Sequence, residues 1–209
     1  MIPGSEAHVA RHRRELRKFF ALQRSVVMPA GSSAIGDFSP DRWNHELQVV
    51  LFTLAVPTIQ AFANEIARRF QVSVNAEDLA PFLRPFTRIT AEATNATTLE
   101  QLGKASLTED VAAAAHHVFD VAEQSRAAQM ADSKVTTEAN LGREFAAKEA
   151  DVREKRWVVT SGNPRPSHAS MNGETTLMRE TFSNGAQWPG DPSLTMDERA
   201  GCSCMVDFG

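Results

Sequence analysis

Apolar residues recur every three to four positions along the chain up to about residue 153, which is the spacing of one face of an α-helix. In the first such segment, 5–27, Val9, Leu16 and Val27 share one stripe with two adjacent phenylalanines. We therefore predict a helix over this range. The tract 28–36 is rich in Gly, Ser and Pro and is typical of a linker. The stripe of the first helix must therefore find a partner, in this chain or in another.

Further helix signals follow the linker. Ser39 is a good N-cap, Pro40 fits the first helical turn, and Phe38 can pack on Trp43, so a second helix should begin here. It should reach about residue 70, with a kink near Pro57. Later helices are predicted over 86–102 (ending at Gly103), over 106–119 (opened by the capping box Ser106 to Glu109) and over 121–151.

The pattern changes near residue 154. β-branched and aromatic residues now alternate with turn signals, among them Asn172-Gly173 and Asn184-Gly185, and strands are predicted over 156–160 and 202–208. The predicted fold class is mainly α, with an extended helical N-terminal region and a small C-terminal α+β module. The predicted domains are an amphipathic basic helix with its linker (1–36), a helical domain (37–153) and the α+β module (154–209).

Charge is unevenly distributed. The formal net charge of −4 gives no overall electrostatic case for nucleic-acid binding. One short stretch of the first helix is nevertheless basic, with Glu15 as the single acid among its cations. We predict that this stretch binds a partner protein or DNA through Arg11, Arg13, Arg14, Arg17, Lys18, Phe19 and Phe20. The most apolar run, 47–59, is too short to span a bilayer, so we predict a buried helix and no membrane.

The candidate chemistry lies in the C-terminal module. His168, Cys202 and Cys204 could hold zinc, with a carboxylate such as Asp191 or Asp197 or a water as fourth ligand. Alternatively, both cysteines are small core residues and His168 bonds a backbone group, with no cofactor; the sequence favours this second interpretation. A Cys–His nucleophilic pair is a third possibility.

The sequence contains no glycine-rich phosphate loop, no G-x-S-x-G motif and no H-E-x-x-H motif. Together with the weak Cys–His signal, this favours a protein that is not an enzyme.

Six short motifs of the module occur in an order that resembles the C-terminal region of the phage Mu F-like minor head proteins, the phage head morphogenesis family that includes the SPP1 portal-associated minor capsid protein. They are Lys155-x-Trp157, Arg165-x-x-His168, Asn172-Gly173, Phe182-Ser-Asn-Gly185, Pro189-Gly-Asp-Pro192 and Cys202-x-Cys204. The resemblance extends upstream through Ser125 to Ala131 and Asn140 to Gly142. Two departures are Asp132-Ser133-Lys134, where many relatives have Arg-Thr-Glu, and Ser203, where many have Arg.

The resemblance implies a structural virion protein, present in several copies at the portal vertex inside the head and assembled in the host cytoplasm. Its expected partner is the portal protein, with the major capsid or scaffold protein and packaged double-stranded DNA as further candidates. The expected role is in head assembly, DNA packaging or DNA ejection. Two alternatives stay open: a zinc- or Cys-dependent effector such as a nuclease delivered with the phage DNA, and a DNA-contacting head protein.

Overall fold

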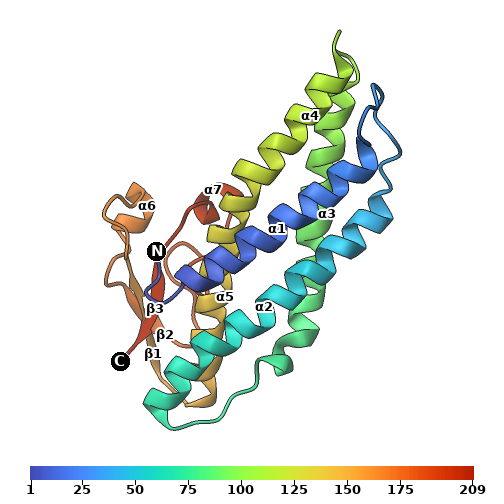
Figure 1. Cartoon of the computed structure of the whole chain (residues 1–209). Coiled ribbons are helices and arrows are strands. Elements are labelled where there is room, and N and C mark those ends of the chain that lie inside the picture. The colour runs from blue at the N-terminus through green and yellow to red at the C-terminus, as the bar shows by residue number, and fades with distance from the viewer. The chain divides into compact units, whose positions relative to one another are not determined.

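The computed structural model describes residues 1–209 and shows long helices followed by a small antiparallel sheet (Figure 1). This confirms the predicted fold class. The long helices are α1 (Glu6–Val27), α2 (Pro40–Phe70), α3 (Ala80–Ala105), α4 (Val111–Val121) and α5 (Ala127–Glu149). A 3-10 turn (Ala76–Leu79) precedes α3, and a π-helical turn (Ala122–Arg126) joins α4 to α5. The module adds the short helices α6 (Pro166–Ala169) and α7 (Met196–Arg199) and the strands β1 (Glu154–Val158), β2 (Thr175–Leu177) and β3 (Met205–Phe208).

The helix starts follow local capping chemistry, with one correction. Helix α2 begins at Pro40 as predicted, and the Phe38 ring packs 6.4 Å from Trp43 between ring centroids. The predicted capping box at Ser106 is wrong, because α3 continues past Gly103 and Ser106 is its C-cap. Asp110 caps α4 instead, and its side chain accepts a hydrogen bond of 2.9 Å from the Ala113 N–H.

The chain folds into two compact units. Unit 1 consists of Met1–Ala10, Ala55–Asp78 and Gln129–Gly209, and unit 2 of Arg11–Leu54 and Leu79–Ala128. These boundaries differ from the predicted ranges 1–36, 37–153 and 154–209, because α1, α2 and α5 each contribute residues to both units.

Unit 2 buries the apolar stripe of α1. Leu16, Phe19 and Phe20 are at most 4% exposed, and the ring of Phe19 meets Trp43 of α2 edge-on at 6.0 Å between centroids. The guanidinium of Arg126 lies over the ring of Phe20. The prediction that Phe19 and Phe20 bind a partner is therefore wrong for this fold, because both are core residues of their own chain.

Helix α2 is long enough and apolar enough, by length and composition, to cross a bilayer. Its apolar residues Leu47, Leu51 and Ile59 are nevertheless buried within the two units, as in a core helix of a folded domain. Composition alone therefore does not make α2 a membrane span.

In unit 1, α5 turns a polar face inward. The Asn140 amide donates to the backbone carbonyls of Pro189 and Cys204 at 2.9 and 3.0 Å, and its oxygen accepts from the Val206 N–H at 2.8 Å. Thr136 donates to the Cys202 carbonyl at 2.7 Å. Buried backbone groups need such partners, so this polar face fixes the C-terminal loops where an apolar face would leave their carbonyls unsatisfied.

The sheet has a buried pair at its centre, and α5 packs closely on α2. The strand order is β2-β1-β3, with Trp157 of β1 opposite Val206 of β3, and both side chains are fully buried. On α5, Gly142 lets the helix approach α2 so closely that a Cβ there would lie 2.4 Å from the Ile59 carbonyl oxygen. Helix α5, which runs beside the sheet in Figure 1, thus packs on both the sheet and the end of α2.

Candidate metal centre

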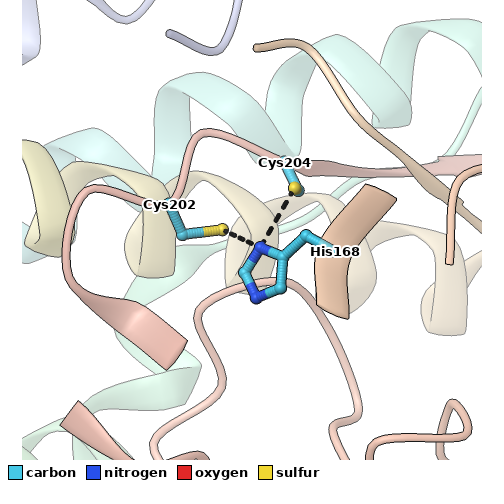
Figure 2. A group of neighbouring side chains, drawn as sticks. All are labelled: His168, Cys202 and Cys204. Carbon is cyan, nitrogen blue, oxygen red and sulfur yellow. Dashed lines mark hydrogen bonds between the residues drawn. The ribbon is translucent and has the colours of Figure 1, made fainter. Parts of the chain in front are cut away.

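Three side chains from two separate segments of the chain meet in unit 1. His168 lies on the short helix α6, which Pro166 begins after the extended residue Arg165. Cys202 and Cys204 lie on the segment between α7 and β3, two residues apart. Figure 2 shows both thiols and the imidazole pointing toward one another. All three side chains are buried, at 4% exposure or less.

The distances within this group are short. The Nδ1 atom of His168 lies 3.5 Å from the Sγ of Cys202 and 3.5 Å from the Sγ of Cys204. The three potential ligand atoms all lie within 4.8 Å of one another. This buried group can hold a metal ion, as the sequence analysis allowed. The expectation that His168 bonds a backbone carbonyl through its side chain is wrong, because its ring contacts sulfur and carboxylate atoms instead.

The second nitrogen of the imidazole faces a carboxylate. The Nε2 atom of His168 lies 2.8 Å from an Oε2 atom of Glu198 on α7, although the approach is not directed along an N–H bond. Ser167 donates to the same carboxylate at 3.1 Å, and Thr195 caps the N-terminus of α7 by accepting from the Glu198 N–H. The carboxylate is thus held beside the ring by its neighbours.

The surrounding backbone is fixed by side-chain donors. Arg165 donates to the carbonyl oxygens of Glu198, at 3.0 Å, and of Ala200. Arg165 thus ties the backbone of α7 to the start of α6. Together with Thr136 and Asn140 of α5, which bind the carbonyls of Cys202 and Cys204, it holds the segment from α7 to β3 in place.

The pKa values of the two thiols are shifted in opposite directions. The hydrogen bond from Cys202, aided by the His168 imidazole, lowers the pKa of Cys204 to about 6 despite its burial. The same hydrogen bond to Cys204, together with burial, raises the pKa of Cys202. Cys204 therefore ionises before Cys202 as the pH rises.

A cavity of about 360 Å³ opens beside the group. Its lining residues are Ser161, Asn163, Pro164, Arg165, Pro166, His168, Gly201, Cys202, Ser203 and Cys204. The cavity therefore gives a small molecule access to a face of the three-residue group.

The two aspartates considered as a fourth ligand do not join the group. The carboxylate of Asp191 accepts from the backbone N–H groups of Gln187 at 2.7 Å and Ser193 at 2.8 Å, which makes it a loop cap. Asp197 is exposed on α7. Neither is among the clustered ligand atoms or the cavity lining.

The other predicted motif residues have structural positions. Trp157 packs edge-on against the rings of His168 and Phe182, at 5.5 and 5.2 Å between centroids. The side chain of Asn172 accepts from the Val159 N–H at 3.0 Å, and Gly173, with φ of 87°, donates to the Trp157 carbonyl at 2.8 Å.

The turn at Gly185 has a φ of 84° and closes on Phe182, whose carbonyl accepts from the Gly185 N–H at 2.8 Å. The turn signal at Asn184-Gly185 thus corresponds to a tight turn, but this turn connects no pair of strands.

The basic residues of α1 differ in exposure. Arg14, Arg17 and Lys18 are exposed, and Glu15 pairs with Arg14 at 2.8 Å and with Lys18 at 3.2 Å. Arg17 donates to the Glu123 carbonyl at 3.1 Å. Arg11 and Arg13 are only partly exposed. Of the five predicted basic residues, Arg14, Arg17 and Lys18 thus form the exposed basic surface of α1.

Sequence reasoning missed Glu198, Thr136 and Asn140. Polar residues are mostly exposed in folded proteins, and only the structure shows that Thr136 and Asn140 are buried. For Glu198 the one local signal is the N-cap pattern beginning at Thr195, which predicts a helix start but not a contact with His168.

Comparisons of the chain with protein-family models, with characterised proteins and with solved structures give no match.

Proposed function

We propose that this chain is a structural minor head protein of a tailed phage, which docks on the portal vertex and assists head assembly, DNA packaging or DNA ejection. The observation that supports the proposal is the ordered set of six motifs that resembles the Mu F-like minor head proteins. All six motifs lie in unit 1, within the segment 155–204.

Contacts between the motifs support treating them as one signature. The first motif, through Trp157, contacts His168 of the second and Phe182 of the fourth. His168 in turn contacts both cysteines of the last motif. Because these motifs are in direct contact, a substitution in one would disturb the packing of the others. The motifs are therefore expected to be kept together as one set.

The exposed cations of α1 are the proposed docking surface. Arg14 and Lys18 lie on the surface of unit 2 and both pair with Glu15, so two cations share one acid and this face keeps a net positive charge. Deleting residues 1–36 would not test docking, because it would also remove Leu16 and Phe19 from the core of unit 2. Charge reversal at the surface avoids that problem.

The test is co-purification of the full chain with the portal protein of the same phage. We expect the double variant Arg14→Glu, Lys18→Glu to bind the portal about tenfold or more weakly at low salt, because it reverses the charge that steers and orients the complex. A matched control is Arg88→Glu with Lys104→Glu, two cations of unit 2 that are also exposed. Absence of portal binding by the unmodified chain would refute the proposal.

A DNA-contacting head protein is the alternative that uses the same cations. Binding of double-stranded DNA through phosphate contacts would fall steeply with rising salt, by a factor that depends on the number of contacts. Steep, salt-dependent DNA binding that the charge reversal abolishes, without portal binding, would favour that alternative.

For the group of His168, Cys202 and Cys204 we propose zinc as the bound ion. Two thiolates and an imidazole form a ligand set that selects zinc among the abundant divalent metals. The ion would cross-link α6 to the segment before β3 and add folding free energy directly.

A further inference from the structure

We infer that this zinc ion has three protein ligands and one exchangeable position open to the adjacent cavity, with Glu198 as the residue that orients His168. The inference rests on the proposed zinc site. It does not depend on the portal role.

Two of the three separations between the ligand atoms match a tetrahedral ion. Zinc–sulfur bonds of about 2.3 Å and zinc–nitrogen bonds of about 2.0–2.1 Å place a sulfur and a nitrogen about 3.6 Å apart at tetrahedral angles. Both observed separations, from Nδ1 of His168 to the sulfurs of Cys202 and Cys204, are 3.5 Å. The ion can therefore be bound with little movement of these two edges of the tetrahedron.

Hydrogen bonding alone explains this arrangement less well. A neutral imidazole nitrogen has either one N–H or one lone pair, so it makes one well-directed hydrogen bond. Here a single nitrogen of His168 lies at equal distance from two sulfurs. A shared cation explains the equal distances, because one lone pair and two thiolates all point at it.

Glu198 occupies the position of an orienting carboxylate. Metal-binding histidines usually present their second ring nitrogen to a carboxylate or carbonyl, which fixes the tautomer and the ring orientation. The Glu198 carboxylate lies beside Nε2 of His168, and the sulfurs lie beside Nδ1. A proton on Nε2 would leave the Nδ1 lone pair for the metal. Because it contacts the opposite side of the ring, Glu198 orients the histidine and does not supply the fourth ligand.

The fourth position has no strong protein ligand. Besides His168, Cys202 and Cys204, the residues lining the cavity include no carboxylate, imidazole or thiol. Three protein ligands with one open position are typical of zinc sites that bind water or a substrate. Two thiolates balance the charge of the ion, and the guanidinium of Arg165 lines the same cavity. We therefore assign the open position to water, exchangeable with a small anion.

The test uses Co²⁺ as a spectroscopic substitute for zinc in the full chain, purified without metal and kept reduced by a phosphine. We expect one equivalent of Co²⁺ to give thiolate-to-cobalt charge-transfer bands and the visible bands of a four-coordinate site. Adding azide should then shift the visible bands in a saturable way. Bands that azide leaves unchanged would overturn the open position but not the zinc site. Failure to bind either metal would overturn both, and portal binding would be unaffected.

The role of Glu198 is tested separately. Glu198→Ala should keep the charge-transfer bands, which show that the thiolate ligands still assemble, while its zinc affinity falls about 10- to 100-fold. The matched control is Asp197→Ala, which removes the neighbouring exposed carboxylate of the same helix and should keep full affinity. Equal zinc affinity in Glu198→Ala and the unmodified chain would overturn the orienting role.

Discussion

Replacing Gly142 by alanine tests the close packing of α5 on α2. The added Cβ would lie 2.4 Å from the Ile59 carbonyl oxygen and 3.2 Å from the Ala63 nitrogen, both of which are backbone atoms. The first distance is roughly 1 Å shorter than an ordinary van der Waals contact. A backbone atom cannot rotate away as a side chain does, so the two helices must separate.

The expected magnitude is a balance of two effects. Overpacking of a well-packed contact costs about 1–3 kcal/mol or more, and alanine gains about 1 kcal/mol over glycine within a helix. We therefore expect Gly142→Ala to lower the free energy of unfolding by up to about 2 kcal/mol. Gly103→Ala in α3 is the matched control, because no atom lies within 4 Å of its added Cβ. This control should be neutral or stabilising by up to about 1 kcal/mol.

The assay is equilibrium unfolding in urea, followed by far-UV circular dichroism and by tryptophan fluorescence. Trp157 and Trp188 lie in unit 1, which contains the Gly142 contact, whereas Trp43 lies in unit 2. The two signals together therefore show whether one unit unfolds before the other. A Gly142→Ala variant as stable as Gly103→Ala would refute the packing argument.

Three further outcomes are expected. Asn140→Ala should lower the free energy of unfolding by about 3 kcal/mol in urea titrations, because it leaves several buried backbone groups without a partner. A loss below about 1 kcal/mol would contradict the hydrogen bonds of Asn140 to the C-terminal loops. Burial lowers the pKa of Lys134 to about 8. Between about pH 8 and 10.5 the unfolded chain therefore binds more protons than the folded chain. The free energy of unfolding should rise with pH in that window, by up to about 3 kcal/mol. Lys134→Met should remove that part of the rise in urea titrations, and an identical pH profile in the variant would show that Lys134 is not the cause. A chelator such as EDTA should lower the melting temperature of the zinc-loaded chain but not that of the double variant Cys202→Ser, Cys204→Ser. An unchanged melting temperature of the zinc-loaded chain would favour packing of the cysteines without metal.

The sequence predicts the local elements well. Periodicity and capping residues place α1 and the start of α2 within a residue, because these features depend on neighbours in the chain. Strand ends are less accurate: β1 begins at Glu154, two residues before its predicted start, because pairing with β2 and β3 sets its limits.

The sequence is a weaker guide to long-range contacts. Shared chemistry suggests that His168 and the two cysteines converge, but nothing local links Glu198 to them. The inward polar face of α5 is missed for a related reason: Asn140 is polar, and polarity alone predicts exposure. The division into two units is missed because it joins residues near the N-terminus to segments far along the chain.

Unit 1 is assembled from segments that are far apart in the sequence, and this affects the order in which the two units fold during synthesis. Its core packs Ile2 with Phe62 and Ala139, and Met205 lies against that cluster. Unit 2, by contrast, is complete once Ala128 has left the ribosome. Domains generally fold as their residues emerge. Ile2 is thus synthesised long before Ala139 and Met205, so unit 2 can fold on the nascent chain while unit 1 closes only after β3 has emerged.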